Sequence, residues 1–261
     1  MRTNRSWILL LLAVVVIAQT APAQDGDDKD PAKAAALVRD AIKARGGDAF
    51  MNVRSVVTRG QYTPFEKGLS GNPAPFVDYV VYPGRERTEF GKGDSKVIQT
   101  NSETVNWVYE AIQKMIRDQT DEQVKGFQQG LRYDLDNLLR TVANAKGVKL
   151  AYLGRREAWK NNFSEAVRVD FDDGGSAILH FDSRSKLPLM IEYKAFTPEG
   201  TVNTESRFFR WVEFGGIQFP TLQDSYRDGK QSARVSFDTV GFNEAVPDKL
   251  FAKPASIKEV K

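Results

Sequence analysis

The feature that most limits how this chain can fold is a period of two in residues 163–242. Residues 167–171, 189–195 and 232–239 each alternate between apolar and polar side chains. Because successive side chains of a strand face opposite sides of a sheet, this period predicts strands with one buried and one solvated face. The second half of the chain is therefore predicted to be β-structure.

Short polar turns join the alternating segments. Residues 172–175 read Asp-Asp-Gly-Gly, residues 197–200 read Thr-Pro-Glu-Gly and residues 228–229 read Asp-Gly. Such turns form hairpins and are too short for the crossover that connects parallel strands. Further strand candidates lie at residues 55–62, 75–82, 86–90, 96–100 and 103–109. The sequence predicts an α+β fold with one antiparallel sheet of about 11 strands, and a sheet of that size must curl or close.

A first helix is predicted directly after Asp30. Asp30 is a suitable N-cap, Pro31 suits the first helical position, and Gly46-Gly47 ends the apolar pattern. A short helical turn over residues 48–53 is predicted to lead into the first strand.

A longer helix is predicted over residues 120–144, starting at a capping box formed by Thr120 and Gln123. One face of this helix is apolar and consists of Val124, Phe127, Leu131, Leu135, Leu138 and Val142. Gly126 and Gly130 each cost about 1 kcal/mol relative to alanine, so the first half is predicted to be the looser half. From the pattern alone, the apolar face fits a helix packed permanently on the sheet.

The first 23 residues are predicted to be a cleaved signal peptide. Arg2 and Arg5 precede a short apolar run that ends in Ala21-Pro22-Ala23, an A-x-A cleavage site. The alternative is an N-terminal membrane anchor, but the run is short of the roughly 20 residues that a spanning helix needs. Residues 24–30 are predicted to be a flexible acidic leader, and residues 31–261 to be one domain. The sequence contains no cysteine, so neither disulfides nor a lipid-modified cysteine is expected, and a periplasmic location is predicted.

The composition argues against several classes of function. The whole chain has 37 basic and 34 acidic side chains, and loss of Arg2 and Arg5 with the signal peptide would leave it almost balanced, so nucleic-acid binding is not expected. His180 is the single histidine, which leaves a zinc site or a Ser-His-Asp triad without its usual residues. A solvated hairpin, rather than a cation site, is the interpretation of the acidic residues Asp170, Asp172, Asp173 and Asp182. We therefore expect no enzyme activity, no metal and no cofactor.

Short motifs in the chain resemble a known family. Residues 82–85 read Tyr-Pro-Gly-Arg, residues 97–101 read Val-Ile-Gln-Thr-Asn, residues 106–109 read Asn-Trp-Val-Tyr, and residues 246–251 read Val-Pro-Asp-Lys-Leu-Phe, followed by Pro254. They are similar to motifs of the outer-membrane lipoprotein carrier and sorting proteins, the LolA/LolB-like family. The resemblance implies an incomplete, half-open antiparallel β-barrel whose apolar concave face is covered by helices, and a monomer that takes up lipid or lipoprotein acyl chains and meets inner- or outer-membrane partner proteins.

The resemblance also implies a set of site residues. The helix over residues 120–144 would form part of the lid, and Arg59 is the candidate residue for tethering it. The cavity would be lined by Val77, Tyr79, Val81, Val105, Trp107, Tyr109, Phe171, Phe209 and Trp211. The abundance of aromatic residues, 11% of the chain, agrees with an apolar ligand site.

Three hypotheses follow, each with its own structural expectation. A carrier for acylated ligands predicts an apolar cavity without a buried group of charges. A sensor or regulatory module on the same scaffold predicts a filled interior and an exposed apolar patch. An acid/base hydrolase predicts two carboxylates that face each other inside a cleft.

Overall fold

The fold is described by a computed structural model of residues 30–144, 147–198 and 200–260. The predicted signal peptide, residues 1–23, and residues 24–29 of the predicted leader lie outside these ranges. The helices are α1 (Pro31–Arg45), α2 (Asp48–Met51), α3 (Asp121–Tyr133) and α4 (Leu135–Ala143), with short 3-10 turns η1 (Gly93–Ser95), η2 (Asp248–Leu250) and η3 (Ile257–Glu259). No helix in the described part of the chain is long and apolar enough to cross a bilayer.

The strands belong to one antiparallel sheet of 14 strands, more than the predicted 11. They are β1 (Ser55–Glu66), β2 (Leu69–Ser70), β3 (Ala74–Val81), β4 (Arg85–Phe90), β5 (Val97–Asn101), β6 (Trp107–Glu110), β7 (Met115–Asp118), β8 (Val148–Trp159), β9 (Asn162–Phe171), β10 (Ser176–Phe181), β11 (Pro188–Thr197), β12 (Gly200–Phe214), β13 (Ile217–Arg227) and β14 (Lys230–Phe242). The short strands β2 and β7 are too brief to produce a recognisable alternation.

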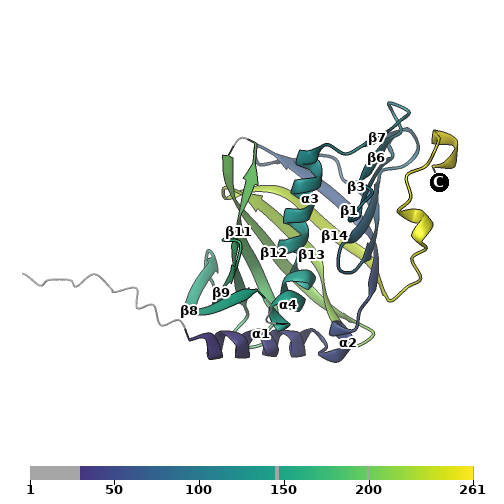
Figure 1. Ribbon diagram of the computed structural model, residues 1–261. Coiled ribbons are helices and arrows are strands. Elements are labelled where there is room, and N and C mark those ends of the chain that lie inside the picture. The colour runs from purple at the N-terminus through teal and green to yellow at the C-terminus, as the bar shows by residue number, and fades with distance from the viewer. Residues whose placement is uncertain (1–29, 145–146, 199, 261) are drawn as a thin grey trace, which may run out of the picture.

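The sheet is a meander that stays open. Its order is β7-β6-β5-β4-β3-β1-β14-β13-β12-β11-β10-β9-β8, with β2 beside β1. The strands run in chain order within each half, and pairing of β1 with β14 joins the halves. Because β7 and β8 lie at opposite ends of this order, the curled sheet forms the half-open barrel that was predicted (Figure 1).

The first helix begins and ends at the predicted residues. The Asp30 carboxylate accepts a hydrogen bond from the Lys33 amide at 2.9 Å. Gly46 follows the last residue with φ 124°, and a Cβ on it would lie 2.5 Å from the Gly216 carbonyl oxygen, so only glycine allows this close approach. α1 packs against β8, β9 and β13 and covers one end of the half-barrel (Figure 1).

The single helix predicted over residues 120–144 is in fact two helices that meet at Asp134. The capping box of Thr120 and Gln123 starts α3 as predicted. Asp134 has an extended ψ of 138°, and its Oδ1 accepts hydrogen bonds from the amides of Asp136 and Asn137, both at 3.0 Å. Asp134 thus ends α3 and caps α4, because its short carboxylate satisfies the free amides at the start of a new helix.

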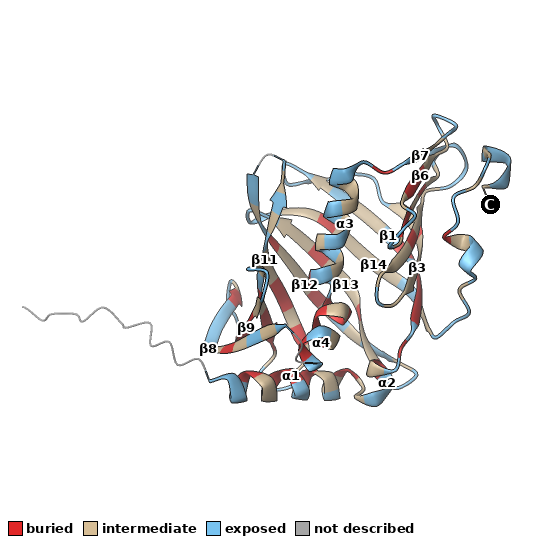
Figure 2. Cartoon of the chain, viewed as in Figure 1, coloured by how far each residue is buried: buried red, intermediate tan, exposed pale blue. Residues whose placement is uncertain are grey.

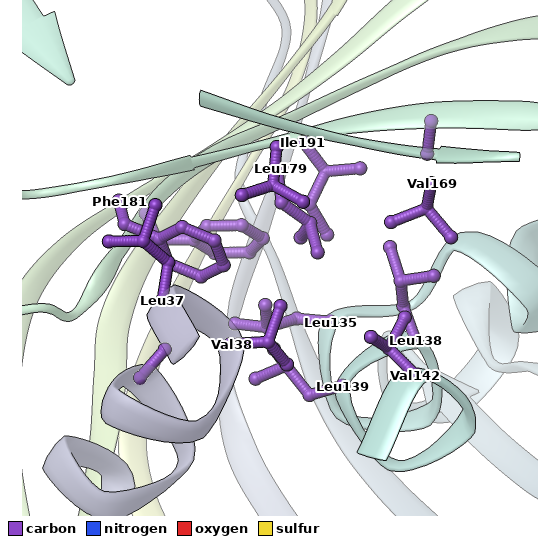
Figure 3. Close-up of a cluster of buried hydrophobic side chains, with 14 of the residues drawn as sticks. Leu37, Val38, Leu135, Leu138, Leu139, Val142, Val169, Leu179, Phe181 and Ile191 are labelled. Atoms are coloured by element: carbon purple, nitrogen blue, oxygen red, sulfur yellow. The ribbon is translucent and has the colours of Figure 1, made fainter. Parts of the chain in front are cut away.

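The two helices are buried to very different extents. In α4, Leu138 and Leu139 have no solvent exposure and pack with Val38 of α1 over Leu179 and the other core side chains of β9 to β11 (Figure 3). α3 carries mainly exposed and half-buried residues (Figure 2). α4 is therefore part of the core, whereas α3 lies over the concave face of the sheet.

Candidate ligand-binding cavity

A cavity of ≈ 410 Å³ lies between α3 and the concave face of the sheet. Its volume falls within the range of about 300–1,000 Å³ that is usual for ligand pockets. Side chains from the helices and from six strands or their ends line it: Asp78, Val80, Tyr82, Glu86, Phe127, Leu131, Tyr133, Asp134, Leu135, Asn137, Tyr193, Ser206, Phe208, Gln223, Ser225 and Phe237. An inner recess of ≈ 120 Å³ extends toward β1, where Val56 and Thr58 join the lining.

The predicted lid residues divide between the cavity and the core. Phe127 and Leu131 of α3 and Leu135 of α4 line the cavity. Leu138 and Val142 instead belong to the core cluster, with 0% and 4% exposure. Val124, near the start of α3, is half-buried.

On β3, the residues that were predicted to line the cavity lie on the outer face of the sheet. This strand directs Asp78 and Val80 into the cavity, followed by Tyr82. Val77, Tyr79 and Val81 alternate with these residues and so face outward. The outer face of β3 is covered as well, so both of its faces carry apolar side chains. Alternation in the sequence therefore could not show which face of β3 is the inner one.

The C-terminal segment, which follows β14 and includes Phe251, covers this outer face. Trp107 has no exposure, and its indole N–H donates to the Phe251 carbonyl at 3.1 Å. Val81, Val105 and Phe251 line a second, surface pocket of ≈ 440 Å³. Trp107 and Val105 are thus near the C-terminal segment rather than in the cavity under α3. Tyr109, two residues after Trp107, faces the same side of β6.

Phe171, Phe209 and Trp211 do not line the cavity, and Phe209 faces the opposite side of the sheet from Phe208. Phe171 packs edge-on against Tyr133, with ring centroids 6.0 Å apart. Phe209 packs against Trp159, while its neighbour Phe208 lines the cavity. The Trp211 ring lies 5.1 Å from the Arg45 guanidinium, at the α1 end of the half-barrel.

Arg59 is exposed and follows Thr58 on β1, so its side chain is on the outer face. The position of Arg59 does not support its predicted role as the lid tether. The helical region is held by Arg45 and Arg140 instead. Arg45 pairs with Asp136 of α4 at 2.8 Å, and Arg140 donates to the backbone carbonyls of residues 50, 51 and 53.

Two carboxyl groups face each other in the cavity. The Thr88 hydroxyl lies 2.8 Å from Asp78 Oδ1 and 3.3 Å from Glu86 Oε1, and the two carboxyl groups are hydrogen bonded to each other. Burial raises the pKa of Asp78 to about 7, and burial together with the charge of Asp78 raises the pKa of Glu86 to about 8. Close carboxyl groups of this kind share a proton, because two adjacent negative charges repel each other.

Asp134 adds a third carboxylate to the lining of the cavity and of its inner recess. Solvent reaches its side chain, so desolvation acts mainly on Asp78 and Glu86, which are better shielded. Sequence reasoning missed all three residues. One signal was present, because an aspartate within the apolar strand at residues 74–81 goes against the usual composition of strands.

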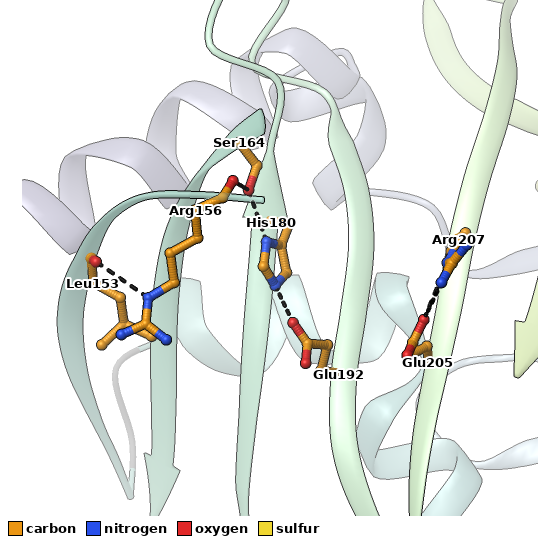
Figure 4. A network of polar contacts seen from close by, with 7 residues as sticks. All are labelled: Leu153, Arg156, Ser164, His180, Glu192, Glu205 and Arg207. Carbon is orange, nitrogen blue, oxygen red and sulfur yellow. Dashed lines mark hydrogen bonds and ion pairs between the residues drawn. The ribbon is translucent and has the colours of Figure 1, made fainter. Parts of the chain in front are cut away.

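His180 forms a separate polar network within the sheet (Figure 4). The Ser164 hydroxyl lies 2.7 Å from His180 Nδ1, and His180 Nε2 donates to Glu192 Oε1 at 2.5 Å. Ser164 and His180 are each 1% exposed, and neither lines the cavity under α3. The two ring nitrogens of His180 on β10 therefore link this strand to β9 and β11.

The fold and the cavity define a class of protein: an open antiparallel half-barrel with a ligand-sized cavity beneath a helix. No family model matches the sequence, and no curated protein matches it. Solved structures do share the fold.

Three of these structures cover most of the chain. A candidate outer membrane lipoprotein-sorting protein domain from Vibrio parahaemolyticus has a TM-score of 0.55 at 10% identity, and the match covers 86% of this chain and 98% of that one. A DUF1329 family protein from Desulfovibrio piger has a TM-score of 0.56 at 15% identity, covering 85% and 98%. A LolA superfamily protein from Nitrosomonas europaea has a TM-score of 0.55 at 11% identity, covering 84% and 97%. The resemblance to lipoprotein-sorting proteins is thus confirmed at the level of the fold.

Proposed function

We propose that the protein is a non-catalytic carrier or binding protein of the periplasm that holds an acylated ligand in the cavity under α3. The observation that carries this proposal is the cavity itself, which has the volume of a ligand pocket and is covered by a helix with half-buried apolar residues. The periplasmic location rests on the predicted signal peptide at residues 1–23.

The division of the helical region into α3 and α4 suits this function. Burying Phe127 and Leu131 completely stabilises the closed state by at most about 1.5–3 kcal/mol each, whereas an acyl chain gains about 0.8 kcal/mol for each buried methylene. A chain of about eight methylenes therefore offsets both contacts. Asp134 is the point where α3 can move while α4 stays in the core.

A sensor or regulatory module is the second candidate. Leu69, Ile112 and Phe196 are 76%, 81% and 72% exposed, and they offer apolar surface to a protein partner. They lie on three different hairpins, however, and the interior contains a cavity where that hypothesis predicts filling. The buried carboxyl pair of Asp78 and Glu86 departs from the charge-free cavity that the carrier hypothesis predicts. The carrier is still the better supported of these two proposals, because the interior has a ligand-sized cavity.

Catalysis by Asp78 and Glu86 fits the geometry less well than binding. Glycoside hydrolases hold their two carboxyl groups about 5 Å or more apart to admit the sugar and water. Asp78 and Glu86 are hydrogen bonded to each other.

Titration with the fluorescent probe 1-N-phenylnaphthylamine tests the proposal. The wild type is expected to enhance the fluorescence of the probe, and Leu131→Asp to weaken its binding about tenfold or more, because the new charge enters the cavity lining. Gln128→Asp is the matched control, since Gln128 is exposed on the same helix. No enhancement by the wild type, or equal loss in both variants, would disprove a ligand cavity under α3.

A further inference from the structure

We infer that the ligand of this cavity is an amphiphile with a primary ammonium headgroup, which Asp78 and Glu86 bind while its chain lies beneath α3. The inference rests on the proposed function, because it assigns the chemical class of the ligand for the same cavity.

The charges that face the cavity are of one sign. Asp78, Glu86 and Asp134 line it, and the described residues that line it include no lysine, arginine or histidine. The arginines beside the helical region already have partners: Arg45 is paired with Asp136, and Arg140 donates to backbone carbonyls. A cationic group would therefore find uncompensated carboxylates here, whereas a fatty acid headgroup would meet like charges.

The carboxyl groups of Asp78 and Glu86 are arranged to accept hydrogen bonds from a ligand. The Thr88 hydroxyl has one hydrogen, which it donates toward Asp78 Oδ1 at 2.8 Å. The remaining lone pairs of the two carboxyl groups are open to a donor in the cavity. An ammonium group has three donors and no acceptor, so it matches this set.

The inner recess supplies an independent sign of a polar ligand group. Thr58 lines this recess together with Asp78 and is only 5% exposed. Its hydroxyl oxygen is buried and has no hydrogen-bond partner. Buried polar atoms normally find a partner, so the free hydroxyl beside Asp78 is explained by a ligand donor that reaches the recess.

The same cavity has room for an apolar chain. Phe127 and Leu131 approach from α3, and Phe208 and Phe237 from the sheet opposite. Among the described residues, no group of three or more His, Cys, Asp or Glu side chains is placed to hold a metal ion. An organic cation with an apolar tail therefore fits the lining better than a metal ion does.

The titration of the carboxyl pair gives the inference a pH signature. The titratable and charged groups that face the pair are Asp134 at the helix junction, Asp136 with its partner Arg45, and Tyr82, over whose ring Arg140 lies. The pair itself is half protonated near neutral pH, because burial raises the pKa of Asp78 to about 7 and that of Glu86 to about 8. An alkylammonium group keeps its charge well above this range, as lysine does with a pKa of about 10.4. Ammonium binding should therefore strengthen from about pH 6 to about pH 8.5 as the pair loses its protons.

Displacement of bound 1-N-phenylnaphthylamine by four competitors tests the inference. Dodecylamine, dodecanol and dodecanoate share one chain length and differ in the headgroup, and butylamine has the ammonium group without the long chain. At pH 8.5 we expect dodecylamine to displace the probe at about tenfold lower concentration than dodecanol, and butylamine to be far weaker. The advantage of dodecylamine over dodecanol should shrink at pH 6.

Three variants separate the role of the carboxyl pair from general effects on the fold. Asp78→Asn and Glu86→Gln should abolish the advantage of dodecylamine over dodecanol. Asp238→Asn, an exposed position next to Phe237 on β14, should behave as the wild type.

The outcomes distinguish the two proposals. If the probe binds but dodecanol and dodecylamine compete equally, the ammonium headgroup is wrong and the carrier function stands. If dodecanoate competes best, the ligand is an acid, which also overturns the inference. If butylamine equals dodecylamine, the site binds a simple cation and the amphiphile is wrong. If the wild type does not bind the probe at all, the proposed function itself fails.

Discussion

Arg45 of α1 and Asp136 of α4 form an ion pair of 2.8 Å in which the arginine side chain has no solvent exposure. The second oxygen of Asp136 accepts a hydrogen bond from the Tyr82 hydroxyl at 3.0 Å, and Arg45 Nε donates to the Gln218 carbonyl at 2.8 Å. One buried pair therefore connects two helices with the end of β3 and with β13. It fixes α4 in the position from which α3 extends over the cavity.

Replacement of one member of this pair should be strongly destabilising. Arg45→Met leaves the Asp136 carboxylate buried without its counter-charge, which costs about 3–5 kcal/mol. The double variant with Asp136→Leu should recover much of this loss, because it removes both charges. The free energy of unfolding in urea is the measurement, and a single variant as stable as the wild type would contradict the anchoring role.

The two halves of the helical region should respond differently to loss of a leucine. Leu138→Ala in α4 removes a side chain with no exposure and is expected to cost about 2–5 kcal/mol. Leu131→Ala in α3 removes a half-buried side chain at the cavity and should cost clearly less. Equal losses in urea unfolding would show that α3 belongs to the permanent core.

Gly126→Ala should stabilise α3 alone. A Cβ at this position meets no other atom within 4 Å, and alanine favours a helix by about 1 kcal/mol over glycine. We expect slower hydrogen exchange of the α3 amides and unchanged exchange in α4. Uniform slowing over both helices would indicate that they open as one unit.

The stability of the protein should fall as the pH rises through the neutral range. The folded protein retains protons on Asp78 and Glu86 up to pKa values of about 7 and about 8, while the unfolded chain loses them near the ordinary carboxyl values of 3.8 and 4.5. In the interval between, the folded state binds more protons, so the free energy of unfolding decreases with rising pH. Each kcal/mol lost lowers Tm by roughly 2–4 °C for a chain of this size.

Glu86→Gln should flatten this pH dependence, because it removes one of the two paired carboxyl groups whose pKa values are raised in the folded state. Asp238→Asn serves as the exposed control and should retain the wild-type slope. The check is thermal unfolding measured from about pH 5 to about pH 8.5. A Tm that rises over this range would contradict the raised pKa values of Asp78 and Glu86.

The sequence was sufficient for the parts of the structure that local patterns determine. The N-cap at Asp30, the capping box at Thr120 and the hairpin turns all depend on a few adjacent residues, and the structure contains each of them. The half-open antiparallel fold also followed from short connections and from the resemblance.

The cavity depended on relationships that local patterns do not contain. β3 is apolar on both faces, because the segment around Phe251 covers its outer side, so alternation could not assign Asp78 to the interior. The helix break at Asp134 was hidden because the apolar spacing continues across it from Leu131 to Leu135. The pairing of Asp78 with Glu86 arises only when β3 and β4 lie side by side.

The pairing of β1 with β14 also determines when the chain can fold. Val56 lies opposite Phe242, so the two halves of the sheet cannot join before nearly the whole chain has been synthesised. The contacts of α1 with the sheet also form late, because they are made with β8, β9 and β13. Contacts so distant in sequence form slowly, since the entropy of closing a long loop must be overcome first. In a nascent chain with this topology, the two halves of the sheet therefore join only once the last strand is available.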